Sequence, residues 1–123
     1  MDDTTKLFDI VKQMEEDVGT EKWETLQQYF TPTFSYKVGS LEPKIGIEGL
    51  KEYMLWQNTL VHWKGHEIHL IAKVDNALIV EVTSFFHRLV DNKRITLPCT
   101  DIYRFDDLKI TDWRVYADIS IFK

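Results

Sequence analysis

The segment that decides the fold runs from Ile95 to Asp118 and reads I-T-L-P-C-T-D-I-Y-R-F-D-D-L-K-I-T-D-W-R-V-Y-A-D. Successive side chains of a β-strand point to opposite faces, so every second residue in its first half shares a face. That face is apolar apart from one carboxyl group and one tyrosine, and it consists of Ile95, Leu97, Cys99, Asp101, Tyr103 and Phe105. A carboxyl group in an apolar stripe is costly to bury in its charged form, so it neutralises, finds a partner or serves a function. Asp101 is therefore the first candidate for the chemistry of this protein.

The composition predicts one folded domain that spans residues 1–123. Of the 123 residues, 44% are hydrophobic and 13% are aromatic, which is enough to build a core. The net charge of −5 argues against binding to a nucleic-acid backbone, which needs clustered Lys and Arg. The single cysteine excludes an internal disulfide and suits a reducing compartment. With no secretory signal pattern and no membrane-spanning apolar run, the sequence predicts a cytoplasmic protein without nucleic-acid or membrane partners.

Three helices are expected in the N-terminal half of the chain. Apolar residues from Leu7 to Val18 recur at helical spacing, and Gly19 ends the pattern. A second, shorter helix is expected after Thr20, with Trp23, Leu26 and Phe30 facing inward and Pro32 as its stop. A short strand pair at 33–38 and 44–45 precedes a third helix, from about Ile47 to Gln57.

The rest of the chain reads as an antiparallel meander. Turn pairs at Asp75-Asn76, Asp91-Asn92 and Asp106-Asp107 separate segments that are rich in β-branched and aromatic residues. The four strands expected are His62–Val74, Ala77–Val90, Lys93–Phe105 and Leu108–Phe122. Helices first and strands afterwards predict an α+β fold, a curved, mostly antiparallel sheet with three N-terminal helices on its concave face. Because apolar residues occur on both faces of these strands, we expect a homodimer through the outer sheet face.

In the order of its elements, and in detail over its last third, the chain resembles the nuclear transport factor 2-like superfamily. The similarity is strongest to its SnoaL-like polyketide cyclase and ketosteroid isomerase branches, and it is carried by Pro98–Phe105 and Lys109–Asp118. The resemblance implies a cone-shaped half-barrel with an internal cavity into which Asp101 points, and a chemistry without a cofactor. In ketosteroid isomerase the matching Asp stays protonated and donates a hydrogen bond to an enolate. In SnoaL-like cyclases it is the general acid/base of an aldol ring closure.

Two other activities of the superfamily fit the sequence poorly. The separate base of ketosteroid isomerase aligns with Tyr36, and its oxyanion tyrosine aligns near residues 12–13. Limonene epoxide hydrolase uses an Arg and two Asp residues; Asp118 matches one carboxylate, but the others fall near Thr83 and Phe85.

Three residues are candidates for catalysis. Asp101 is the expected proton donor or shuttle, and His87, placed on the cavity side by the resemblance, is its expected partner. Asp118 is an orienting group if its face turns to the cavity mouth. An ordinary structural interpretation stays open for each: a core hydrogen bond for Asp101, a strand-end position for His87, and solvent contact for Asp118.

The predicted substrate-binding residues are aromatic: Tyr36, Tyr116, Trp56, Trp63, Phe85 and Tyr103. Packing alone is the alternative for Tyr36 and for the tryptophans, whereas Tyr116 follows Asp118. No metal site is expected, because on a strand His62 and His66 share a face while His69 points away. The acidic run Glu15–Asp17 is interpreted as a solvated helix face or end.

The sequence thus predicts a cofactor-free acid/base enzyme, an isomerase, cyclase or hydrolase. Its substrate is expected to be a small apolar carbonyl or epoxide compound bound in the internal cavity. The alternative is a non-catalytic dimeric domain that binds a small ligand or another protein.

Overall fold

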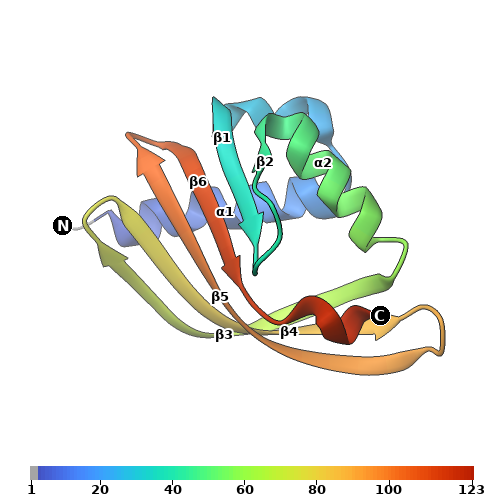
Figure 1. Cartoon of the computed structure of the whole chain (residues 1–123). Coiled ribbons are helices and arrows are strands. Elements are labelled where there is room, and N and C mark those ends of the chain that lie inside the picture. The colour runs from blue at the N-terminus through green and yellow to red at the C-terminus, as the bar shows by residue number, and fades with distance from the viewer. Residues whose placement is uncertain (1–2) are drawn as a thin grey trace.

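One curved sheet of six strands carries the helices on its concave side (Figure 1). The structure is a computed structural model, and residues 3–123 are described. The elements, in chain order, are α1 (Thr4–Gly19), the 3₁₀ helix η1 (Trp23–Gln28), β1 (Phe30–Val38), β2 (Lys44–Ile45), α2 (Gly46–Gln57), β3 (Val61–Val74), β4 (Ala77–Arg88), β5 (Lys93–Asp106), β6 (Lys109–Tyr116) and the 3₁₀ helix η2 (Ile119–Phe122).

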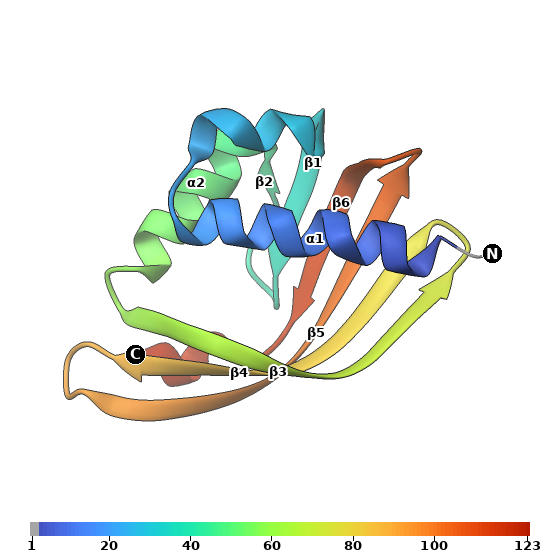
Figure 2. The same ribbon diagram turned by 180° about the vertical axis from the view of Figure 1, so that it is seen from behind.

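The strand order is β2-β1-β6-β5-β4-β3, and only β1 and β6 run parallel to each other. Figure 2 shows α1 crossing the concave side of the sheet, and α2 lies against β1 and β2. The predicted α+β fold with a curved, mostly antiparallel sheet is confirmed. No helix within residues 3–123 is long and apolar enough to cross a membrane.

The core lies between the helices and the concave face. The predicted stripe of α1 is buried at Leu7, Val11 and Met14, and α2 contributes Leu50 and Tyr53. Burying one such Leu or Val side chain contributes roughly 1.5–3 kcal/mol to folding. A second, smaller cluster fills the opposite end of the sheet and consists of Val61, Phe86, Ile95, Leu97 and Phe122.

Two predicted elements differ in the structure. The second helix is a single stretch of 3₁₀ helix that ends at Gln28, so Phe30 begins β1 instead of closing a helix. The last strand ends at Tyr116, six residues earlier than expected. The cause lies at Asp118, whose side chain accepts a 3.1 Å hydrogen bond from the Ser120 N–H and so caps η2.

Strand β3 contains two extra residues relative to β4. Trp63 pairs with Phe86 but His66 pairs with Ser84, so one residue is inserted, next to Gly65 with φ +108°. A second insertion lies between Ile68 and Leu70. Between these bulges the sides of the strand are exchanged, which turns His66 to the concave face. The expectation that His62 and His66 share a face is therefore wrong, because His62 pairs with His87 on the opposite face of β4.

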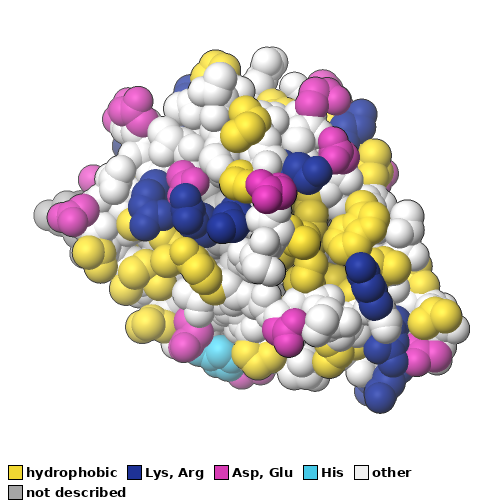
Figure 3. Space-filling view, viewed as in Figure 1, with side chains coloured by type: hydrophobic (Ala, Val, Ile, Leu, Met, Phe, Trp, Pro, Cys, Tyr) yellow, Lys and Arg dark blue, Asp and Glu magenta, His cyan; other side chains and the backbone are white. Residues whose placement is uncertain are grey.

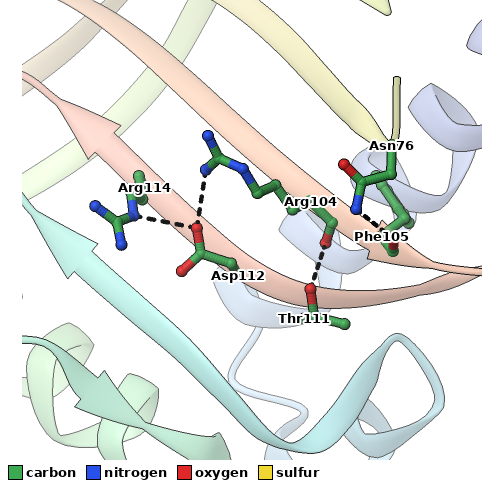
Figure 4. Close-up of polar contacts among 6 residues, drawn as sticks. All are labelled: Asn76, Arg104, Phe105, Thr111, Asp112 and Arg114. Carbon is green, nitrogen blue, oxygen red and sulfur yellow. Dashed lines mark hydrogen bonds and ion pairs between the residues drawn. The ribbon is translucent and has the colours of Figure 1, made fainter. Parts of the chain in front are cut away.

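The outer face of the sheet is mixed in character. Figure 3 views the molecule from the side away from α1, where hydrophobic side chains lie around a group of charges. At the centre of this group Asp112 Oδ2 accepts hydrogen bonds of 3.1 Å from Arg104 Nη1 and from Arg114 Nε (Figure 4). Nearby, two side chains donate hydrogen bonds to backbone carbonyls of β5: Asn76, in the β3–β4 turn, to Phe105, and Thr111, on β6, to Arg104.

Candidate functional site

A cavity of about 400 Å³ lies between the helices and the concave face of the sheet. Its walls are mainly apolar, and the lining side chains of this kind include Val38, Met54, Val61, Val82, Phe86, Leu97, Val115, Ile119 and Phe122. Two carboxyl groups, Glu15 and Asp101, reach this apolar space. Within the described part of the chain, no Lys or Arg lines the cavity to balance them.

Asp101 lies where the alternation of β5 predicts it. Leu97, Cys99 and Asp101 all line the cavity. The Tyr103 hydroxyl donates a 3.0 Å hydrogen bond to Asp101 Oδ2, and the Cys99 thiol donates one of 3.1 Å to Oδ1. Burial raises the pKa of Asp101, while these two donors and the Trp113 indole N–H act in the opposite direction.

Glu15 reaches the cavity from α1. Tyr103 Oη lies 3.5 Å from Glu15 Oε1, and His66 Nδ1 lies 3.8 Å from Oε2. The side chain keeps 23% of its surface exposed, and this residue lines the cavity. Burial first and the nearby Asp101 second raise the pKa of Glu15 to about 8, against the opposing effect of the Tyr103 hydrogen bond.

The interpretation of Glu15–Asp17 as a solvated helix face or end is therefore wrong for Glu15 and for Asp17. Glu15 is four residues after Val11 and three before Val18, so helical periodicity places it at the edge of the buried stripe. Asp17 is buried beside η1 and does not line the cavity. The helical spacing could have predicted the buried position of Glu15, but its charge favoured a prediction of solvent exposure.

An aromatic wall closes the cavity on the side of β1 and β6. Tyr36 packs edge-on against Trp113 at 4.6 Å and against Tyr53 at 5.4 Å between ring centroids. Within residues 3–123, Tyr53 Oη is a buried side-chain polar atom without a hydrogen-bond partner, and Trp113 Nε1 acts on Asp101 without a hydrogen bond of regular geometry. A buried donor without a partner costs about 1–3 kcal/mol. A polar atom of a bound molecule would recover that cost.

The predicted binding residues divide into two groups. Tyr36 and Trp63 line the cavity, and Tyr103 lies fully buried behind it, where its hydroxyl holds both carboxyl groups. Phe85 does not line the cavity.

His87 is also outside the cavity, contrary to the expected orientation of its strand. In the register, Val80 pairs with Asp101, Val82 with Cys99 and Ser84 with Leu97. Directly paired residues share a face, so the alternate residues Phe85 and His87 lie on the outer face. The β4 residues that pair with Leu97, Cys99 and Asp101 therefore face the cavity, and those between them face outward.

The remaining candidates lie near the C-terminus and away from Asp101. Asp118 caps η2, and hydrogen bonding to Ser120 lowers its pKa. It lines a second groove, between the β1–β2 turn, α2 and η2, together with Trp56, over which the Lys123 ammonium lies at 5.6 Å. Tyr116 is 52% exposed on the outer face. None of the three lines the cavity as expected, because Asp118 caps η2, Tyr116 faces outward on β6 and Trp56 lies on α2 beside the second groove.

No group of three His, Cys, Asp or Glu side chains between residues 3 and 123 is arranged to hold a metal ion. The family model of the SnoaL-like domain matches residues 11–113. The chain belongs to the SnoaL-like family. Among curated proteins, none matches its sequence.

Solved structures share the fold of this SnoaL-like chain at low sequence identity. A protein from Xanthomonas campestris pv. campestris, assigned as a polyketide cyclase, is 11% identical with a TM-score of 0.83 over 98% of this chain and 96% of its own. An epoxide hydrolase of the LEH-like type from M. tuberculosis is 19% identical, with a TM-score of 0.73 over 96% and 86%. A ketosteroid isomerase-like protein from Catenulispora acidiphila, in complex with trimethylamine, is 14% identical, with a TM-score of 0.76 over 90% and 86%.

Proposed function

We propose that this SnoaL-like domain is a cofactor-free acid/base enzyme, an isomerase, cyclase or hydrolase. It acts on a small apolar carbonyl or epoxide compound bound in the cavity, and Asp101 transfers the proton. The observation that carries this proposal is a carboxyl group held by two hydrogen bonds in the wall of an apolar cavity of about 400 Å³. Cavities of roughly 300–1,000 Å³ with a few polar groups are typical of small-molecule sites.

The surroundings of Asp101 suit proton transfer. Burial raises its pKa above that of an ordinary aspartate, which makes its carboxylate a stronger base. The mainly apolar wall screens charges less than bulk water does, so the contact of Asp101 with the reacting atom is electrostatically stronger than in bulk solvent. General acid/base catalysis of this kind contributes about 10²–10⁴-fold in rate. The positions of His87 and Asp118 do not favour a part in this step.

The solved structures with the same fold support a small-molecule substrate. They include a protein assigned as a polyketide cyclase, an epoxide hydrolase and a protein in complex with trimethylamine. A shared fold hosts many reactions, so these likenesses guide the choice of compounds to test and do not select one reaction.

The experiment is a screen of ketones, lactones and epoxides by thermal shift, followed by product analysis of every stabilising compound. For a compound that is converted, D101N should reduce turnover by about 10²–10⁴-fold. The matched control is D106N, at the exposed end of the same strand. Unchanged turnover in D101N would overturn the proposal. A compound that binds but is recovered unaltered would favour the non-catalytic binding domain.

The protein is also proposed to be a homodimer, associated through the outer sheet face. Support comes from the large apolar side chains on that face, which include the exposed Leu70, Val74 and Tyr116. Such side chains are commonly covered by a partner. The single-domain organisation over residues 1–123 and the cytoplasmic location remain predictions.

A further inference from the structure

Two carboxyl groups from different elements meet at one hydroxyl. Tyr103 Oη lies 3.0 Å from Asp101 Oδ2 on its own strand and 3.5 Å from Glu15 Oε1 on α1. A tyrosine hydroxyl has one proton to donate and can accept a hydrogen bond as well. When Tyr103 donates to Asp101, it can accept from Glu15 only if Glu15 carries a proton. The three groups then form one hydrogen-bonded chain from Glu15 through Tyr103 to Asp101.

The contacts decide which carboxyl group holds the proton. Asp101 accepts hydrogen bonds from the Tyr103 hydroxyl and the Cys99 thiol, and such donors stabilise a carboxylate. Glu15 shares only the longer contact with Tyr103, and His66 Nδ1 stands 3.8 Å away, beyond hydrogen-bonding distance. Asp101 therefore ionises first, and its charge then favours the neutral form of Glu15.

The other groups that face Glu15 do not change this order. From β5 these are Asp101, Tyr103 and Cys99, and Tyr36 faces it from β1. Burial raises the pKa values of Tyr36, Tyr103 and Cys99, so these side chains stay neutral near pH 7. From β3 comes His66, whose pKa burial lowers, so the imidazole is neutral as well. One negative charge is thus shared by two carboxyl groups.

A second observation points to a ligand at this pair. Tyr53 Oη is buried in the cavity wall and has no hydrogen-bond partner among residues 3–123, whereas the Trp113 indole N–H acts on Asp101. The Tyr53 hydroxyl can donate to an oxygen atom of a bound molecule. Because the described chain places no Lys or Arg in the cavity lining, an anionic ligand is disfavoured and a neutral carbonyl compound fits.

We propose that Glu15 is the general acid and Asp101 the general base of one proton-transfer pair, and that the Tyr103 hydroxyl passes the proton between them. The substrate class is an uncharged carbonyl compound with a C–H bond next to the carbonyl group. This inference rests on the proposed function and narrows it.

The step balances without an oxidant, a reductant or a metal. Asp101 takes the proton of the carbon next to the carbonyl group, and the electron pair of that C–H bond forms a carbon–carbon double bond. The carbonyl π pair moves to oxygen, which receives the proton of Glu15, so a neutral enol forms. The Asp101 proton then passes to Tyr103 while the Tyr103 proton passes to Glu15, which restores both groups. Where a further double bond is conjugated to the enol, Glu15 gives its proton to the far carbon of the dienol while Asp101 takes the proton of the enol hydroxyl, so the carbonyl group re-forms and an isomer results.

The first test needs no substrate. Infrared titration of the protonated carboxyl band should show a group in the wild-type protein that loses its proton near pH 8. E15Q should remove this titration, and D101N should move it to lower pH because the repelling charge is gone. E16Q, an exposed neighbour on the same helix, should leave it unchanged. A wild-type protein without such a group, or an E15Q protein that retains it, would overturn the inference.

The second test follows deuterium exchange at the carbon next to the carbonyl group of 2-tetralone by NMR. Wild-type exchange should fall above about pH 8 as Glu15 loses its proton, and E15Q should be slower by about 10²-fold or more and lack this decline. Loss of exchange in D101N with wild-type rate and pH profile in E15Q would overturn the inference and leave the proposed function standing. Wild-type exchange rates in both E15Q and D101N would overturn both the inference and the proposed function. If the wild-type protein does not accelerate exchange of 2-tetralone, the carboxyl titration alone decides the inference.

Discussion

The Tyr29 hydroxyl donates a 2.8 Å hydrogen bond to the buried carboxylate of Asp17, and so ties the end of α1 to the start of β1. Asp17 also accepts from the Thr25 hydroxyl at 3.1 Å and from Gln13 Nε2 at 3.3 Å. These hydrogen bonds, that of Tyr29 above all, hold the pKa of Asp17 below its ordinary value. The Tyr29–Asp17 hydrogen bond stabilises the packing of α1 against β1, whereas Glu15, two residues before Asp17, lines the cavity.

Asp17→Asn is expected to destabilise the protein at pH 7 by about 1–3 kcal/mol, because an amide accepts these bonds less strongly and brings an unpaired donor. The pKa of Asp17 is lower in the folded state, so its contribution is present above its ordinary value of 3.8 and is lost as the pH falls through the folded-state pKa. Urea unfolding at pH 7 and at pH 3 measures both effects. The difference from wild type should shrink at pH 3, and a constant difference would contradict this account. Glu16→Gln is the control.

Cys99 is expected to resist alkylation in the folded protein. Burial first, and the neighbouring Asp101 second, raise the pKa of its thiol, so little reactive thiolate is present at pH 8. Iodoacetamide labelling followed by mass spectrometry should be slow in buffer and fast in urea, with one label per chain. Rapid labelling of the folded protein would show that the thiol is open to solvent. D101N should label faster than wild type, since the repelling charge is absent.

Gly65→Ala should destabilise the protein by about 1–3 kcal/mol, because the φ of +108° at the first bulge of β3 disfavours any other residue. The added methyl group itself has open space, with nothing within 4 Å. Gly19→Ala is the matched control, since it also has open space but no positive φ. Denaturant unfolding of both variants measures the two changes in stability. Equal changes would contradict the explanation that the positive φ of Gly65 causes the loss.

Sedimentation equilibrium should find the wild-type protein as a dimer and Ile102→Lys as a folded monomer. Ile102 lies on the outer face between Ile79 and Arg114 in neighbouring strands, so a lysine would place a charge at the centre of the proposed interface. Val90→Lys, at an 83% exposed position in the β4–β5 turn, should remain dimeric. Circular dichroism verifies that both variants are folded. A monomeric wild-type protein would end the dimer proposal.

Local periodicity was sufficient to predict much of this fold and part of its site. The stripe of α1 and the alternation of β5 depend only on the spacing of residues in one segment, so Asp101 was placed correctly at the cavity, whereas Tyr36 was placed there through the family resemblance. The places of Phe85 and His87 depend on how two strands pair, which one segment does not contain. A charged residue at the edge of an apolar stripe, such as Glu15, is ambiguous until the elements that pack against it are known.

The two extra residues of β3 compensate each other. The first exchanges the faces to which the following side chains point, and the second restores the original alternation. Only the stretch around His66 and Ile68 exchanges sides, while Trp63 before it and Ile71 after it keep the same phase. Removing one residue at each bulge would leave His66 opposite Ser84 and Ile68 opposite Val82, and the strand ends would keep their partners as well. Two short deletions would therefore make β3 regular and still leave His66 beside Glu15, with the helices and the other strands untouched.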